Sequence, residues 1–292
     1  MKNTKKLLVI YGPTAVGKTN LAIQLALQHK TEIISADSRQ FFKEMKIGTA
    51  VPEQKELDAI NHHFIQHKSI RENYNVGLFE KEAISKIEEL FKHHKTLIMV
   101  GGSGLYIDAV CKGLDIFPNI EENLRKELRQ KFEEYGLQWL QDEVKKIDPN
   151  FYAISDLNNY QRLLRCLEVC KQSGQTFSSF KNKQNKTRPF EVEYISIKMD
   201  REKLYKRIND RVDIMMEKGL LKEVESLIKF KDLNALKTVG YSELFQYLNK
   251  DISMDKAVKL IKQNSRRYAK RQMTWLKPVS YTHLTLPTKR IV

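Results

Sequence analysis

The residues with the most specific chemistry form a short run near the start of the chain, Gly12-Pro13-Thr14-Ala15-Val16-Gly17-Lys18-Thr19, which follows the pattern G-x-x-x-x-G-K-[ST]. Its glycines let successive backbone N–H groups turn inward as an anion nest at the positive end of a helix. Lys18 adds a mobile positive charge, and the hydroxyl of Thr19 is placed to bind Mg²⁺. A glycine-rich turn that binds nothing is the alternative. The flanks favour phosphate binding, because an apolar run precedes the loop at 7–11 and a helix-compatible run follows at 21–27.

A carboxylate follows the second expected strand, in Ala36-Asp37-Ser38-Arg39-Gln40. The carboxyl ends of parallel strands face the ligand crevice, so Asp37 is expected to face the group beyond the phosphates, with Ser38 and Gln40 supplying hydrogen bonds. The later strand at 97–100 ends in a glycine-rich run and offers no carboxylate of the kind that organises Mg²⁺ in a P-loop kinase. From the residues alone, a simple turn cap remains an equally good interpretation of Asp37.

The elements that must position these residues alternate between strands and helices over the first hundred residues. Strands are expected at 7–11, 32–35 and 96–100, and helices at 18–28 and 78–93. Each strand is short and apolar and is followed by a polar loop, which is typical of a parallel sheet buried on both faces. We therefore predict an α/β fold with a P-loop NTPase-like parallel sheet flanked by helices.

From about 120 to 187 the pattern changes to helices with their own apolar spacing. Apolar residues recur in steps of three and four, and Asp148-Pro149 interrupts them, which predicts a mostly helical insertion with a small core. A strand is then expected at 190–199 and a helix at 201–218, with helical segments to about 276. The expected divisions are the first part of the core at 1–118, the insertion at 119–187, the second part of the core with basic C-terminal helices at 188–278, and a non-native tail at 279–292.

The charge of the chain favours a polyanionic partner. The formal net charge is +15, and the stretch 256–277 carries eight Lys or Arg and no Asp or Glu. A protein that binds nucleic acid uses such an excess of positive charge to raise its affinity and to steer its encounter with the nucleic acid. A merely solvated basic surface is a common alternative.

The composition also excludes several classes of protein. The chain has no apolar run of about 18 residues, so no membrane span is expected. Cys111, Cys166 and Cys170 are too few for a disulfide framework and are expected to be buried free thiols. A cleaved leader at the basic start would remove the first strand, so we expect a cytoplasmic enzyme. His62-His63 and His67 are expected to serve packing or a polar loop rather than a metal.

Several segments occur in one order that closely resembles the bacterial tRNA dimethylallyltransferases, the tRNA isopentenyltransferases of the IPP transferase family. The similarity spans about residues 5 to 277, and the segments that carry it are 12–19, 37–40, 45–50, 101–106, 161–169, 239–241 and 268–275. The most discriminating are the Asp-Ser-x-Gln of 37–40 and the Tyr-Ala-Lys-Arg-Gln that begins at Tyr268. Ser103 stands where the family more often has Thr, and Leu276 where it has an aromatic residue.

The resemblance implies a Mg²⁺-dependent enzyme that uses dimethylallyl diphosphate. It would transfer the dimethylallyl group to the exocyclic amine of the adenosine 3′ to the anticodon in tRNA and release diphosphate from the loop 12–19. The implied catalytic residues are Asp37 as general base, Ser103 as an orienting hydroxyl, and Lys18 and Arg211 as cations on the diphosphate. For Arg211, a surface ion pair with Asp210 or Asp213 is an equally good interpretation.

The implied RNA partner is the anticodon stem-loop of tRNA. Its target adenine is stacked and must be flipped out to reach an enclosed site. The residues implied to contact RNA are Asp37, Ser38, Arg39, Gln40, Ser103, Arg125, Gln161, Arg162, Leu163, Leu164, Arg165, Lys270 and Arg271. For Arg125 alone, a solvated helix face is the commoner interpretation. Zinc is not expected, since the chain lacks the Cys and His set of the eukaryotic zinc finger, and a monomer is the default expectation.

Other classes of function share part of this pattern. A small-molecule or nucleotide kinase shares the loop and the acidic residue after a strand, but it leaves the basic terminal helix unexplained. A nonenzymatic RNA-binding module explains the charge but not the loop together with Asp37. An enzyme that adds isoprene to free adenine nucleotides is a closer rival, against which Arg125, Arg162 and Arg165 in the insertion favour polymeric RNA.

Overall fold

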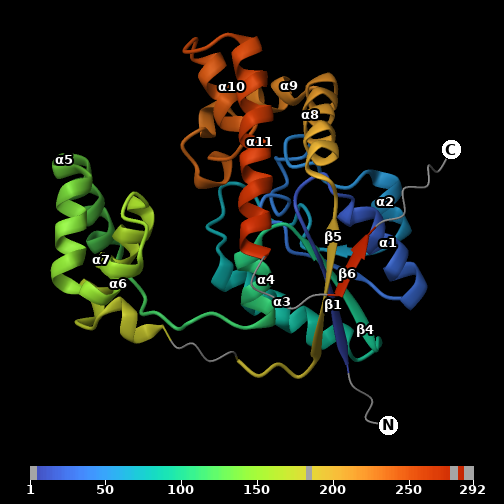
Figure 1. Cartoon of the computed structure of the whole chain (residues 1–292), viewed down its shortest axis with the longest axis horizontal. Helices are drawn as coiled ribbons and strands as arrows, with labels where there is room; N and C mark the ends of the chain where they lie inside the picture. Colours follow the sequence, from blue (N-terminus) through green and yellow to red (C-terminus); the bar gives the residue numbers. More distant parts are fainter. Residues whose placement is uncertain (1–4, 182–185, 277–281, 286–292) are drawn as a thin grey trace. The chain divides into compact units, whose positions relative to one another are not determined.

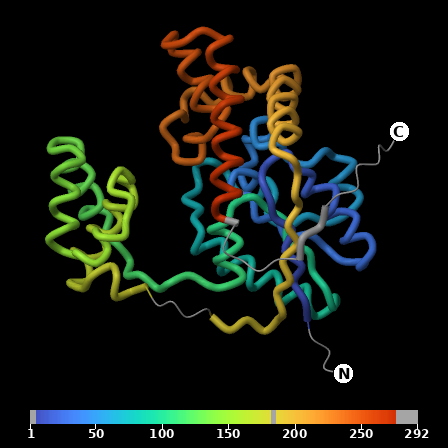
Figure 2. The backbone as a smooth tube through the Cα atoms, viewed as in Figure 1, coloured from blue at the N-terminus to red at the C-terminus, as the bar shows by residue number. Residues whose placement is uncertain are grey.

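A parallel sheet forms the centre of the larger of two compact units. The computed structural model describes residues 5–181, 186–276 and 282–285. One unit comprises 1–112 with 187–292 and is here called the α/β unit; the other, 113–186, is called the helical unit. The chain leaves the α/β unit after the last turn of α4 and returns to it before β5 (Figure 2). The sequence analysis expected the insertion at 119–187.

The sheet has the strand order β3-β2-β4-β1-β5-β6, and all of its pairs are parallel (Figure 1). The strands are β1 (Lys6–Tyr11), β2 (Ile33–Ser35), β3 (His62–His63), β4 (Thr96–Gly101), β5 (Glu191–Lys198) and β6 (Thr282–Thr285). Every predicted strand is confirmed to within two residues. The predicted α/β fold with a P-loop NTPase-like parallel sheet is therefore confirmed.

Helices cover both faces of this sheet. In the α/β unit they are α1 (Lys18–His29), α2 (Gln54–Ala59), α3 (Val76–Leu90), α4 (Gly104–Cys111), α8 (Arg201–Glu217), α9 (Leu220–Ser226), α10 (Tyr241–Leu248) and α11 (Met254–Leu276), with short 3₁₀ helices at Ile228–Phe230 and Asn234–Leu236. Alternate residues of β1 enter different cores, as its pleat requires. Leu7 and Val9 pack in the core with α3, α4 and α10, while Leu8 and Ile10 pack in the core with α1 and α8.

Several short elements were not predicted. The strand β3 consists of His62 and His63 and pairs with β2. His67 packs edge-on against the rings of Phe41 and Phe64, and burial lowers its pKa to about 4. The strand β6 pairs with β5 and lies within 279–292, where the sequence analysis expected a non-native tail and no strand. The rest of this tail lies outside the described residues.

The helical unit has its own core, as predicted. It consists of α5 (Glu122–Ile147), α6 (Pro149–Ile154), α7 (Tyr160–Ser173) and a 3₁₀ helix (Phe177–Phe180). Its core joins Leu128 and Leu140 of α5 to Leu167 of α7. The predicted break at Asp148-Pro149 is confirmed, because Asp148 caps α6 by accepting from the N–H of Phe151.

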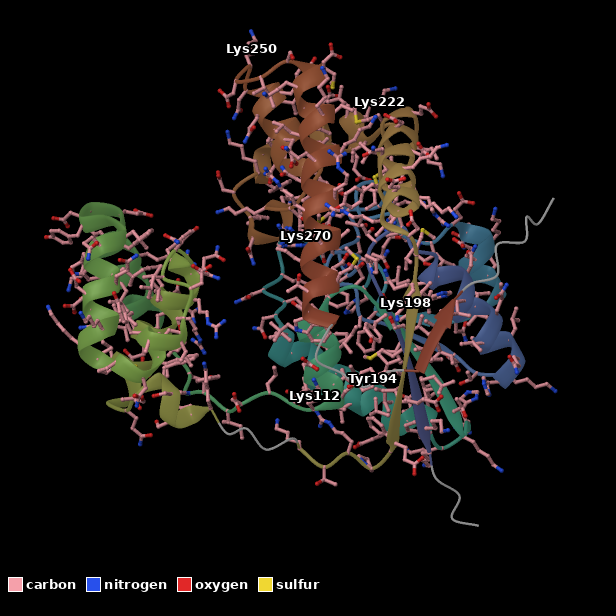
Figure 3. The ribbon with its side chains drawn as sticks, in the orientation of Figure 1. Lys112, Tyr194, Lys198, Lys222, Lys250 and Lys270 are labelled. Atoms are coloured by element: carbon pink, nitrogen blue, oxygen red, sulfur yellow. The ribbon has the colours of Figure 1, made fainter. Side chains whose placement is uncertain are left out.

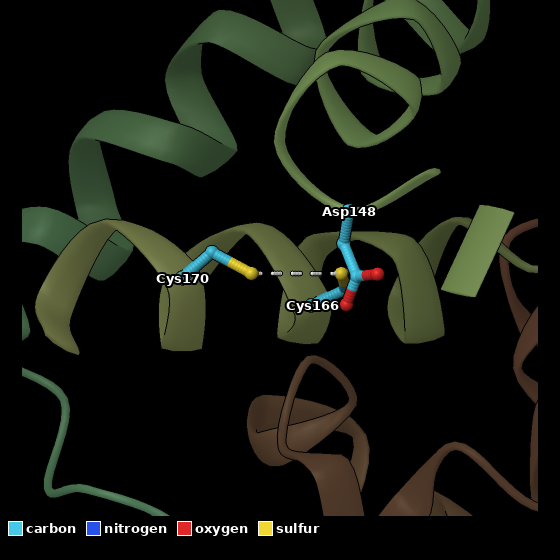
Figure 4. A group of neighbouring side chains, drawn as sticks. All are labelled: Asp148, Cys166 and Cys170. Atoms are coloured by element: carbon cyan, nitrogen blue, oxygen red, sulfur yellow. Dashed lines mark hydrogen bonds between the residues drawn. The ribbon is translucent and has the colours of Figure 1, made fainter. Parts of the chain in front are cut away.

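Two of the three cysteines meet the cap of α6. Cys166 and Cys170 are buried free thiols on α7, as predicted, with their sulfurs 4.0 Å apart beside the Asp148 carboxylate (Figure 4). That carboxylate also accepts from the N–H and the hydroxyl of Ser178, at 2.7 and 2.9 Å. The Sγ of Cys170 accepts from the N–H of Phe177 at 3.1 Å. These hydrogen bonds join the start of α6 to the chain after α7, which is a structural role.

None of the helices in the described ranges combines the length and the apolar character needed to cross a bilayer.

Candidate active site

The phosphate loop lies between the end of β1 and the start of α1, as predicted. Gly17 has φ 106°, a left-handed conformation that favours glycine, immediately before the first residue of α1. The Nζ of Lys18 donates to the carbonyl oxygens of Gly12 and Pro13, both at 2.9 Å, so the ammonium lies over the loop. Burial lowers the pKa of Lys18 to about 8, and the nearby Asp37 carboxylate opposes this shift. A partly desolvated cation at a helix N-terminus favours an anionic ligand.

A cavity of about 460 Å³ opens over this loop. Its walls include three cations, Lys18, Arg207 and Arg211, and two carboxylates, Asp37 and Asp210. The Nη1 of Arg211 donates to the Oγ1 of Thr14 at 3.2 Å. Burial lowers the pKa of Arg211, and the Asp37 charge opposes this effect. The side chain of Arg211 therefore points to the phosphate loop, while Asp213, one of its alternative partners, pairs with Lys262 at 2.6 Å.

A second cavity, of about 550 Å³, adjoins the first. Both are lined by Thr14, Asp37, Arg211 and Tyr268, and the second extends along Ser38, Gly48, Lys237, Gly240 and Arg271. Asp37 is thus in the wall of the cavity over the phosphate loop and in the wall of the neighbouring one.

The hydroxyls of Ser38 and Ser103, both predicted to lie near Asp37, are within hydrogen-bond distance of each other. The Oγ of Ser103, the residue before α4, accepts from the backbone N–H of Ser38 at 3.0 Å and lies 3.0 Å from the Ser38 Oγ. Burial raises the pKa of Tyr268 to about 12, with a hydrogen bond to Ser103 opposing the shift. The ends of β2 and β4 approach so closely that a Cβ on Gly101 would lie 2.5 Å from the carbonyl oxygen of Ala36.

The side chains of Arg39 and Gln40 bind backbone carbonyls of neighbouring loops. The Nη1 of Arg39 donates to the carbonyl oxygens of Asn234 and Ala235, at 3.1 and 2.9 Å. The Nε2 of Gln40 donates to the carbonyl oxygens of Thr49 and Ala50, at 3.2 and 3.0 Å. In this structure both residues hold the loops that line the cavities, whereas the sequence analysis expected them to contact RNA.

Glu223 of α9 was not predicted as a site residue. Its carboxylate accepts from three consecutive backbone N–H groups, those of Lys46, Ile47 and Gly48, at 3.0, 2.7 and 3.0 Å. It also accepts from the hydroxyl of Tyr241 at 2.6 Å. The resemblance included both 45–50 and 239–241, but nothing local in the sequence marked the acid that joins them.

The helix α11 forms one wall of the site and bears the predicted basic residues. Lys270 and Arg271 are exposed (Figure 3 labels Lys270), and the Arg271 guanidinium lies 5.7 Å from the ring centroid of Tyr268. Gln272 is buried and joins two loops. Its Oε1 accepts from the N–H of Thr14, and its Nε2 donates to the carbonyl oxygen of Gly102, both at 2.9 Å.

The predicted RNA contacts of the insertion all lie in the helical unit and divide into exposed and buried groups. Gln161 and Arg162 are exposed on α7. The buried Glu168 pairs with both Arg125 and Arg165, at 3.6 and 3.4 Å, and both arginines remain partly accessible. Leu163 and Leu164, also expected to contact RNA, have their side chains buried in the core of the helical unit. Their identity is explained by packing.

A family model described as IPP transferase matches residues 40–278. A tRNA dimethylallyltransferase of Christiangramia forsetii is 52% identical over 271 residues, which cover 93% of this chain and 90% of that protein. A protein of the same name from Flavobacterium johnsoniae is 53% identical over 279 residues, covering 94% of this chain and 90% of that protein.

Solved structures of tRNA-modifying transferases are also similar to this chain in fold and sequence. A tRNA isopentenylpyrophosphate transferase from Bacillus halodurans superposes with a TM-score of 0.71 at 37% identity, covering 96% of this chain and 90% of that one. A eukaryotic dimethylallyltransferase acting on tRNA superposes with a TM-score of 0.82 at 28% identity, covering 97% and 74%.

Proposed function

The chain belongs to the IPP transferase family, and from this premise we propose that it is a tRNA dimethylallyltransferase acting on the adenosine 3′ to the anticodon. The observation that carries the proposal at this site is that Asp37 and Arg211 line both adjoining cavities. One cavity contains the phosphate loop and suits dimethylallyl diphosphate. The other leads past Asp37 toward the exposed cations of α11 and suits a flipped adenosine. The active form is proposed to be a cytoplasmic monomer.

Transfer forms a bond between the exocyclic nitrogen of adenine and the allylic carbon, and the bond from that carbon to diphosphate breaks. Negative charge grows on the leaving diphosphate, so the loop N–H groups, Lys18 and Arg211 act where charge develops. The fixed position of these donors makes them more effective than water, because they need little reorganisation during the reaction.

Asp37 is the proposed general base. It lies in the walls of both cavities and accepts the proton that the amine loses as the new bond forms. Its backbone is fixed locally, because the N–H of Arg39 donates to its carboxylate at 3.1 Å and the N–H of Gln40 to its carbonyl oxygen at 3.0 Å. Ser103 and Ser38 orient the same region through their paired hydroxyls.

The residues around the phosphate loop fit a Mg²⁺ ion. Thr19, Ser35 and Asp37 line the same cavity and offer hydroxyl and carboxylate oxygens, the hard ligands that Mg²⁺ prefers. Thr19 would hold the ion together with the substrate, as its place after Lys18 in the motif suggests. Bound there, Mg²⁺ would neutralise part of the negative charge of the diphosphate.

The RNA partner is proposed to be the anticodon stem-loop of tRNA. In the α/β unit the exposed Lys270 and Arg271 offer positive charge beside the second cavity. In the helical unit Arg162 and Arg165 lie over the rings of Phe151 and Phe117, at 5.6 and 5.7 Å from the centroids. Cations of this kind bind the phosphate backbone with an affinity that falls as salt rises.

The test is incubation with Mg²⁺, unmodified tRNA and radiolabelled dimethylallyl diphosphate. Label should move into the tRNA, and Asp37→Ala should abolish the transfer although the variant still binds tRNA. Asp58→Ala, an exposed carboxylate on α2, is the matched control and should transfer as the unmodified protein does. Transfer to free adenine nucleotides but not to tRNA, or consumption of ATP with a small acceptor, would reject the proposal.

A further inference from the structure

Three side chains that can bind a metal ion converge in the core of the helical unit. The sulfurs of Cys166 and Cys170 and a carboxylate oxygen of Asp148 all lie within 4.8 Å of one another (Figure 4). All three residues are buried, the cysteines on α7 and the aspartate at the junction of α5 and α6. In the described part of the chain, no other His, Cys, Asp or Glu residues form such a group.

The two sulfurs have the separation expected of two ligands of one ion. Cys166 and Cys170 are four positions apart on α7, so both side chains project from one face of the helix. Their Sγ atoms are 4.0 Å apart. Two thiolates that each lie about 2.3 Å from a tetrahedral Zn²⁺ are about 3.8 Å from each other. The helix therefore presents the pair at nearly the distance that the metal requires.

Hydrogen bonds already orient two of the three ligands. The Oδ1 of Asp148 accepts from the N–H of Phe151 and from the hydroxyl of Ser178, and its Oδ2 accepts from the N–H of Ser178. Since a carboxylate has about four acceptor positions, one remains on Oδ2 for a further partner. The Sγ of Cys170 accepts from the N–H of Phe177 at 3.1 Å, a contact that favours the thiolate. Such contacts to the ligands typically support a metal site.

The charges around the cluster balance a divalent ion. Burial lowers the pKa of Lys181, whereas the nearby Asp148 and Cys166 raise it. Two thiolates, one carboxylate, one ammonium and one divalent ion together carry no net charge. With both thiols protonated, the carboxylate and the ammonium cancel as well. Neither state leaves an uncompensated charge in the core, which would be costly.

We propose that Asp148, Cys166 and Cys170 form a structural Zn²⁺ site in the helical unit. Thiolate sulfur is a soft ligand that suits zinc, whereas Mg²⁺ prefers oxygen, so this site is distinct in chemistry from the phosphate loop. Three protein ligands leave the fourth tetrahedral position to a water molecule. The ion joins the start of α6 to α7 by coordination bonds. The expectation of no zinc concerned the zinc-finger residues, and this site uses other ligands. The proposal does not depend on the proposed function.

The test is elemental analysis of the full chain, produced in cells supplied with Zn²⁺ so that the ion is present while the buried ligands fold. About one zinc ion per chain should remain after gel filtration. Cys166→Ser and Cys170→Ser should each lose this zinc. Cys111→Ser, which removes the buried thiol outside the cluster, is the matched control and should retain it. Circular dichroism checks that each variant is folded.

Production with Cd²⁺ in place of Zn²⁺ identifies the ligands. The protein should show the ultraviolet charge-transfer band of cadmium–thiolate bonds, and Cys111→Ser should show it as well. Asp148→Asn keeps a residue that caps helices well but removes the anionic ligand, so its zinc content should fall. This variant decides the question if the cysteine variants do not fold.

Absence of zinc from the unmodified protein would overturn the proposal. So would zinc that is retained in full by Cys166→Ser or by Asp148→Asn, because the ion would then be bound elsewhere on the chain. A cadmium protein without the charge-transfer band would also overturn it, since the thiols would not be ligands.

Discussion

The hydroxyl of Tyr241 donates to the carboxylate of Glu223 at 2.6 Å, and the same carboxylate accepts hydrogen bonds from three consecutive N–H groups of the loop 45–50. A Cβ on Gly48 would lie 2.5 Å from the Tyr241 ring, so the loop, the tyrosine and the acid are packed without space between them. Because Gly48 and Thr49 line the second cavity, this contact fixes part of the wall of the site.

Replacing the acid should therefore loosen that wall. Glu223→Gln leaves some of the donors without an acceptor and should lower the free energy of unfolding by about 1–3 kcal/mol. Tyr241→Phe removes one donor and should cost about 0.5–1.5 kcal/mol. Urea denaturation measures both, with Glu225→Gln, at an exposed position of the same helix, as the control. Equal stability of the two glutamine variants would show that Glu223 does not hold the loop.

The affinity for diphosphate should depend on the protonation of Lys18. Because burial lowers the pKa of Lys18 to about 8, the free protein loses this charge as pH rises through that value. Affinity should be constant below about pH 8 and fall above it by up to about tenfold per pH unit. Lys18→Arg keeps its charge throughout, so its affinity should lack that fall.

Calorimetry at pH 7, 8 and 9 compares the two proteins with the same ligand. The ionisation of diphosphate itself is common to both titrations, so the ratio of their affinities reports Lys18 alone. A ratio that stays the same at all three pH values would mean that Lys18 remains charged in the free protein.

The glycine at the end of β4 should be essential for the position of Asp37. In Gly101→Ala the new Cβ would meet the carbonyl oxygen of Ala36, a backbone atom that moves only if the chain leading to Asp37 moves with it. A misplacement of about 1 Å costs on the order of 10²-fold in rate, so kcat for transfer should fall by about that factor. Circular dichroism checks that the sheet remains. Unchanged kcat in a folded variant would place the base elsewhere.

Substitutions at two neighbouring residues of α7 should have different effects, one on stability and the other on RNA binding. Leu163→Ala removes a fully buried side chain and should destabilise the helical unit by about 2–5 kcal/mol. Arg162→Ala alters an exposed residue, so stability should stay within about 0.5 kcal/mol. It should weaken RNA binding and reduce the slope of log K against log salt by about 1. Filter binding at several salt concentrations measures this slope, and an unchanged slope would remove Arg162 from the RNA interface.

The sequence predicted those parts of the fold and site that depend on local pattern. The phosphate loop, the strands around it and the break at Asp148-Pro149 each carry their signal within a few residues. The roles of Arg39, Gln272 and Glu223 could not be predicted, because each binds backbone groups 170 or more positions away. A polar residue beside a reactive one looks the same in sequence whether it contacts the ligand or another loop.

Hydrophobic residues within a segment that resembles a functional motif can serve packing alone, and the sequence does not distinguish the two roles. Leu163 and Leu164 lie between two arginines, and only the fold shows that they face the core. The short strand β3 was missed because its two residues carry too little periodicity to be distinguished from a loop, whereas β6 lies within 279–292, which was set aside as a non-native tail.

The position of β1 in the sheet has a consequence for how the protein is made. β1 pairs with β4 on one side and with β5 on the other, and the whole helical unit is encoded between those two partners. On the ribosome, one edge of β1 stays unpaired after β4 has formed, until residue 198 has been synthesised. At roughly 5–20 residues per second this interval lasts on the order of 5–20 s. The helical unit has time to fold during it, while the open edge of a nearly complete sheet is the place where the nascent chain is most exposed to aggregation and to chaperones.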